Sequence, residues 1–478
     1  MKKKQAGIVC LLVLGAVSKV LAADIAVTKK MDASVGKADF KSAVAALTAG
    51  QEADNPAYPE KEAIVLYLDK GLLEHYSGNY AASQDDLQNA ERLITEAFTK
   101  SVTEGAASYI LNDNTKTYPG EDYEDVYLNV FNALNYYNQG KFKDALVEIR
   151  KLSESSGKLA RLAKKYEGAD AKAAKENEGI LTKALGVLGG VTVVYPPEAP
   201  VNFTDSALAH YLCALFYKAN GNASDARIEF DAIQKAYAAA PDVYKNPLPS
   251  SIEEDKNVPE GKARLNVIGF TGLSPIKTEQ IVAADFSWLQ TQRLTGYFLN
   301  EFEHPKLKMP TLTAKGRSAG SDKATVTVTG NGFKGTFTLE LIENMGGAAI
   351  AAFNGKFTST YKKTFWRTVL KYGSGMAGVK IAADEAKKKA EGKPPALVNA
   401  AAQAGAIAAA KLVVAGLDAT EGADVRGGRY FPNKALAGGI TLDPGTYTVK
   451  IAIGKTTITK EIEVKDGSLN LIEAFDIR

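Results

Sequence analysis

The sequence predicts a multidomain protein of mixed α and β structure, with an α-solenoid of paired helices first and a β-sheet or sandwich-like domain with inserted helices after it. Two observations lead to this fold class. Glycine-anchored spacing typical of helix pairs recurs before residue 240, and alternating apolar residues around tight turns recur after residue 262. At 478 residues the chain is also long for one hydrophobic core.

The beginning of the chain predicts export. Lysines at positions 2–4 precede an apolar run over residues 6–17. Val20–Ala22 supplies the small residues that a signal peptidase needs at its cleavage site. A membrane anchor is the alternative, but the run is shorter than the roughly 20 residues of a spanning helix and Lys19 interrupts its end. We therefore expect a bacterial secretory signal over residues 1–22 and a mature protein in the periplasm or on the cell surface.

Charge and cysteine content exclude two classes of protein. The chain has 58 basic and 55 acidic residues, and removal of residues 1–22 takes four lysines and no acid, which leaves 54 against 55. A nearly neutral chain without a long basic run lacks the electrostatic footprint of nucleic-acid binding. Cys213 is then the only cysteine, so no internal disulfide can form. Its apolar helical surroundings predict a buried thiol.

Residues 23–240 are expected to form the helical domain. Gly78 is followed at offsets of two, five, nine and twelve residues by Tyr80, Ser83, Leu87 and Ala90, and Gly140 and Gly221 begin similar series. Glycine turns the chain, small residues let two helices approach, and large apolar residues fill the groove to the next pair. These residues resemble the tetratricopeptide repeat over about residues 30–240, with insertions between the units. A plain helical bundle is the alternative.

The first helix of each predicted pair carries aromatic side chains that could line a groove. Tyrosine offers a large contact area with a polar tip and is enriched in interfaces. The alternative is that these side chains belong to the core of the helix pairs. On the groove interpretation we expect a protein partner, as an extended peptide or a helix, to bind at Tyr67, Tyr76, Tyr127, Tyr136, Tyr137, His210 and Tyr217.

A Pro-rich linker is predicted over residues 241–262, where four prolines punctuate an acidic stretch. The β-rich domain is expected over residues 263–478. Its first strand lies at 264–270, a helix is expected at 281–302, and a hairpin is expected at 323–342 around the Asn331-Gly332 turn.

Two long helices are expected next, near residues 357–391 and 396–417, followed by strands from Gly445 to the C-terminus. The second helix is rich in alanine and resembles a membrane segment in composition. Because it contains Gln403 and Lys411, we expect it to be buried between protein elements instead.

The search for catalytic chemistry yields no site. The three histidines, His75, His210 and His304, lie apart without metal-ligand spacing, so no metal or cofactor is expected. Gly454-Lys455-Thr456 lacks the first glycine of a phosphate-binding loop and turns a hairpin. We do not expect an enzyme, although a site of scattered carboxylates would escape this search.

Five short segments carry a wider resemblance: Tyr118–Asp125, Asn132–Tyr136, Gly272–Glu279, Ala423–Arg426 and Leu442–Tyr447. They resemble an uncharacterised family of exported bacterial proteins, often lipoproteins, that join an N-terminal tetratricopeptide-like region to a C-terminal β-rich domain. The chain differs from the lipoprotein members because it lacks a lipid-accepting cysteine at the cleavage site. The resemblance implies no activity.

The sequence thus predicts a non-enzymatic scaffold or assembly factor of the bacterial cell envelope that binds a protein partner through its helical region. In the alternative, the C-terminal β domain binds cell-wall glycan or forms a structural component of a larger envelope machine. An envelope hydrolase that uses acids such as those of residues 121–125 is a third possibility.

Overall fold

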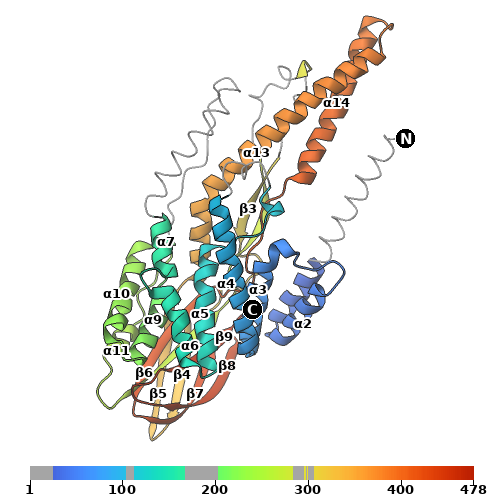
Figure 1. Ribbon diagram of the computed structural model, residues 1–478. Coiled ribbons are helices and arrows are strands. Elements are labelled where there is room, and N and C mark those ends of the chain that lie inside the picture. Colours follow the sequence, from blue (N-terminus) through green and yellow to red (C-terminus); the bar gives the residue numbers. More distant parts are fainter. Residues whose placement is uncertain (1–24, 104–111, 167–202, 284–294, 298, 300–305) are drawn as a thin grey trace.

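The computed structural model describes residues 25–103, 112–166, 203–283, 295–297, 299 and 306–478 (Figure 1). The predicted secretory signal lies outside the described residues, as does most of the helix expected at 281–302. The first residues of that helix form the end of strand β2 (Ile276–Ala283) instead. The mixed α and β class is confirmed.

The N-terminal half consists of antiparallel helices, beginning with a helix over residues 25–35. The other helices described in this half are α2 (Phe40–Gln51), α3 (Ala63–Ser77), α4 (Tyr80–Thr103), α5 (Asp122–Asn138), α6 (Phe142–Ser153), α7 (Lys158–Tyr166), α9 (Ala207–Ala219) and α10 (Ala223–Ala239). The predicted turns at Gly78, Gly140 and Gly221 have positive φ angles of 83°, 73° and 80°, which glycine adopts without strain. A Cβ atom at Gly71 would lie 2.7 Å from Leu87 Cδ2, so α3 and α4 need glycine there.

The C-terminal half contains one curved sheet of seven strands in the order β8-β7-β4-β5-β6-β1-β9, rather than two facing sheets. The strands are β1 (Ala263–Thr271), β4 (Lys323–Gly330), β5 (Phe333–Glu343), β6 (Lys434–Leu442), β7 (Gly445–Ile453), β8 (Thr456–Val464) and β9 (Asn470–Asp476). Among the described strands, only β1 and β9 pair in parallel. Thr456 Oγ1 of β8 lies 2.9 Å from Asp476 Oδ1 of β9. This contact between the two edge strands makes the sheet a nearly closed barrel.

The hairpin predictions are confirmed. Strands β4 and β5 pair with Gly330 opposite Phe333, and the turn residues Asn331 and Gly332 have φ angles of 48° and 73°. Side chains that alternate along the strands, such as Val326, fill the barrel interior. The alternation in the sequence therefore marks the inner face of the sheet.

The helices and the sheet share one hydrophobic core. All nine residues of β1 are buried, because one face of the strand points into the barrel and the other contacts the helices. The ring centroids of Phe270 of β1 and Phe131 of α5 are 5.1 Å apart.

Residues 241–262, which were predicted as a linker, include helix α11 (Ser251–Lys256). Its buried Asp255 accepts a 2.6 Å hydrogen bond from Arg264 Nε of β1.

A pair of long helices projects from the body. Helix α13 (Met345–Lys389) and helix α14 (Pro395–Thr420) pack antiparallel, and we call them the arm. Figure 1 shows the arm, in orange, extending well beyond the sheet and the other helices. Residues spaced three, four or seven apart form its seam: Tyr372, Met376, Val379 and Ala383 of α13, and Ala406, Ala410 and Leu417 of α14. Strand β2 pairs with β3 (Lys306–Thr313), which lies near the base of the arm.

The expectation that α14 is buried between protein elements is wrong for most of its surface. The described residues contain one helix long and apolar enough in composition to cross a membrane, which is α14, and only 22% of its most apolar stretch is buried. The physical reason is that α13 covers one side of α14, whereas Leu412 on the other side is 75% exposed.

Candidate functional site

The inner face of the helical half, where the predicted tyrosines lie, contacts the protein's own C-terminal half. The hydroxyl of Tyr76 donates a 2.9 Å hydrogen bond to the carbonyl oxygen of Tyr430, and that of Tyr127 donates to Glu343. Tyr137 donates at 2.8 Å to Leu469 O and accepts at 2.9 Å from the N–H of Leu471 in β9. These three side chains line an internal interface, not an open groove.

The other predicted site residues lie between helices and do not join them. Tyr136 accepts a 2.8 Å hydrogen bond from Gln88, and Tyr217 lies 2.7 Å from the hydroxyl of Ser153. Tyr67 on α3 is half-buried beside the core. The structure therefore distributes the seven residues over several contacts rather than gathering them at one surface.

His210 forms an ion triad. Its Nε2 lies 2.7 Å from Asp205 and its Nδ1 lies 2.5 Å from Glu229. Burial alone would lower the pKa of His210, but the two carboxylates outweigh burial and raise it to about 9. The imidazolium is therefore charged at neutral pH, and it links α9 to α10 instead of serving as a neutral metal ligand.

An extended segment, residues 421–433, crosses the inner face of the helices, and we call it the strap. It joins α14 to β6. Its backbone N–H groups at Gly428 and Arg429 donate 2.6 Å hydrogen bonds to Glu124 of α5 and Asp69 of α3. The ring of Phe431 lies 6.1 Å from that of Tyr123. The strap therefore contacts Tyr76 and Tyr127, two of the seven residues predicted to bind a peptide partner.

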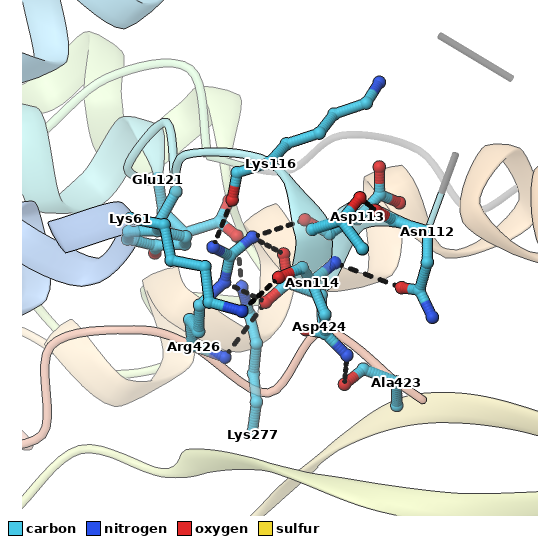
Figure 2. A network of polar contacts seen from close by, with 12 residues as sticks. Lys61, Asn112, Asp113, Asn114, Lys116, Glu121, Lys277, Ala423, Asp424 and Arg426 are labelled. Atoms are coloured by element: carbon cyan, nitrogen blue, oxygen red, sulfur yellow. Dashed lines mark hydrogen bonds and ion pairs between the residues drawn. The ribbon is translucent and has the colours of Figure 1, made fainter. Parts of the chain in front are cut away.

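Charged groups fix the strap to the loop before α5, as Figure 2 shows. Arg426 donates to the carbonyl oxygens of Lys116 at 2.7 Å and Asp113 at 2.8 Å, and to its neighbour Asp424 at 2.8 Å. Asn114 donates a 2.9 Å hydrogen bond to Ala423 O. These bonds give backbone carbonyl oxygens of the strap and the loop side-chain donors, and the Asp113 oxygen also accepts from the N–H of Lys116 at 3.0 Å.

The same region binds the base of the arm. Glu121 forms ion pairs with Lys277 of β2 and with Lys356 of α13, the latter at 2.8 Å. Burial would raise the pKa of Glu121, but the two ammonium groups hold it well below its usual range. Farther along, Glu421 pairs with Arg367 at 2.8 Å, and both side chains are buried. The arm is therefore held to the body by charge pairs at several points.

Three buried carboxyl groups in this interface have raised pKa values because burial disfavours their charge. The pKa of Asp69 and that of Glu343 are each raised to about 7, and that of Glu124 is raised as well. Each accepts hydrogen bonds from a tyrosine hydroxyl and from backbone N–H groups. Their donors are all intramolecular, so the geometry supports a structural role for them.

A cavity of about 320 Å³ lies elsewhere, between the end of α9, the start of β1 and the turn before β9. Asp69, Glu124 and Glu343 do not line it. Lys218 at its wall donates to the carbonyl oxygens of Asp255 and Lys256 at the end of α11, which is a helix-capping contact. Among the described residues, no group of three histidine, cysteine or acidic side chains is arranged to hold a metal ion.

Comparisons with protein-family models, with curated proteins and with solved structures yielded no match. The fold and the site therefore define a class only by architecture: helix pairs packed on a nearly closed sheet, with a strap across the helices and a projecting arm. The resemblance to exported bacterial proteins stays a prediction. The sequence did not predict the path of the strap, because residues 421–433 carry no periodic pattern; only Ala423–Arg426 stood out, as one of the segments of the wider resemblance.

Proposed function

We propose that the protein is a non-enzymatic, exported structural component or assembly factor of the bacterial cell envelope, and that the arm is its contact element. In this proposal the tetratricopeptide-like helical region supports the arm and is not an open peptide groove. The secretory signal expected over residues 1–22 supports export.

The observation that carries the proposal is the exposed apolar side of α14. Leu412 and Leu397 are 75% and 55% exposed, and most of the alanines between them are exposed or half-buried. A projecting element with a continuous apolar side is the kind of surface that marks an interaction site.

The way the arm is attached supports the same function. The ion pairs of Glu121 and Glu421 hold α13 against the body and the strap. Because the arm is already ordered before it meets its target, binding carries little additional conformational entropy cost.

A photo-crosslinking amino acid placed at position 412 in cells tests this function. We expect a covalent adduct of higher mass at position 412, whatever the target is. The matched control is position 228, an exposed isoleucine on α10, where we expect none. Absence of any adduct at position 412, or equal adducts at both positions, would contradict the proposal.

A further inference from the structure

The two sides of the arm differ in chemistry. Between Pro395 and Leu417, Lys411 is the only charged residue of α14, and the most apolar stretch has a mean hydropathy of 1.6. On α13, the exposed positions opposite the seam include Asp384 and Glu385 near the tip and also Leu370 and Ile381, with Lys380 on the flank. Since seam residues mark the facing sides of both helices, the outer side of α14 is apolar apart from the exposed Lys411, and the outer side of α13 carries acids together with apolar side chains.

The tip of the arm is basic. Lys387, Lys388 and Lys389 end α13 and are exposed, and Lys393 follows in the connection, with Glu391 the one acid there. Consecutive helical residues are about 100° apart, so the three lysines cover more than half of the helix circumference. Their long side chains can reach toward the plane on which α14 would lie. Residues 380–411 contain six lysines and three acids.

These features favour one occupant of the apolar side. A core helix would be mostly buried, which α14 is not. A second copy of the chain would bring a second basic arm close to the first, and like charges repel. A hairpin that spans a membrane would carry Lys380, Asp384 and Glu385 into hydrocarbon. A helix pair that lies in the lipid interface turns the apolar side of α14 toward the lipid and keeps the charged side chains of α13 in water.

We propose that the arm binds the surface of an anionic lipid bilayer, with α14 in the interface and the tip lysines at the lipid phosphates. The proposal rests on the proposed function, because it names the target of the same contact element. It also explains why the arm projects, since a flat surface can reach α14 only where the body does not stand in the way (Figure 1).

Vesicle flotation with the full mature chain tests the proposal. We expect the protein to float with vesicles of phosphatidylglycerol and phosphatidylcholine, and to float at least about tenfold less with phosphatidylcholine alone, because the lysines lose their counter-charge. Leu397→Glu with Leu412→Glu should lower flotation at least about tenfold, because a carboxylate would enter the interface. Replacing the three tip lysines by glutamine should lower it on anionic vesicles only.

The matched control is Ile381→Glu, since Ile381 is 64% exposed on the outer side of α13 and should stay in water. Circular dichroism of each variant checks that the fold is kept. Three results would overturn the proposal: no flotation of the unchanged protein, equal loss with Ile381→Glu and the leucine variants, or a dimer in solution that the leucine changes dissociate. If flotation fails while a protein adduct forms at position 412 in cells, the proposed function stands and the lipid target is wrong.

Discussion

Single buried side chains connect the helices to the sheet. Glu343, at the end of β5, accepts hydrogen bonds from Tyr127 of α5 and from the hydroxyl of Ser206 and the N–H of Leu208 at the start of α9. Burial raises its pKa from 4.5 to about 7 despite these donors. One carboxyl group thus joins two helices to a strand, and its protonation contributes to stability.

The pH dependence follows from the sign of this shift. The folded protein holds the proton of Glu343 up to about pH 7 while the unfolded chain loses it near 4.5, so stability falls as pH rises through this window. We expect Glu343→Gln to destabilise the protein less at pH 8 than at pH 5, by about 1–3 kcal/mol, since one pKa unit corresponds to about 1.4 kcal/mol. Urea unfolding at the two pH values measures the difference.

A comparison variant is Asp69→Asn, because burial raises the pKa of Asp69 to about 7 as well. This change should also destabilise the protein less at pH 8 than at pH 5. A penalty for Glu343→Gln that is equal at both pH values, or larger at pH 8, would show that the buried group is ionised throughout.

At the scale of elements, the arm depends on close approach of its helices. A Cβ atom at Gly405 of α14 would lie 2.8 Å from Ala386 Cβ of α13, whereas one at Gly378 would have no atom within 4 Å. Both residues are inside helices, where glycine costs up to about 1 kcal/mol relative to alanine. Only at Gly405 does packing require the missing side chain.

The two glycines therefore predict opposite effects. Gly378→Ala should stabilise the arm by about 0.5–1 kcal/mol through helix propensity. Gly405→Ala should destabilise it by about 1–3 kcal/mol, because Ala386 cannot rotate its Cβ away. Hydrogen exchange of the arm amides measures both. The packing account would be refuted by Gly405→Ala raising protection as much as Gly378→Ala does.

At the scale of the whole molecule, the helices and the sheet form one unit. His75 of α3 lies 2.7 Å from Asn135 of α5 and 3.0 Å from Glu473 of β9, and its ring lies 5.3 Å from that of Phe475. These contacts join residues almost 400 positions apart. Because the two halves bury the same apolar surface, unfolding one exposes the core of the other.

We therefore expect a single unfolding transition, with the far-ultraviolet circular dichroism of the helices and the near-ultraviolet circular dichroism of the tyrosines buried in the shared core changing together. Tyr137→Phe should lower stability by about 1–3 kcal/mol, since it leaves the Leu471 N–H of β9 without its partner, and should shift both signals equally. Tyr136→Phe, which removes a hydroxyl that accepts a hydrogen bond from Gln88, is the control and should have a smaller effect. Separate transitions for the two signals would contradict the shared core.

The sequence by itself determined the local structure. Glycine turns at Gly78, Gly140 and Gly221, the Asn331-Gly332 hairpin and the two long helices could be predicted because their signals lie within a few residues of each other. Only the tertiary structure decided what covers each apolar face. Tyr76, Tyr127 and Tyr137 contact the strap and the sheet, whereas Leu397 and Leu412 on the outer side of α14 stay exposed. Burial depends on which distant faces come together, and no local pattern encodes that choice.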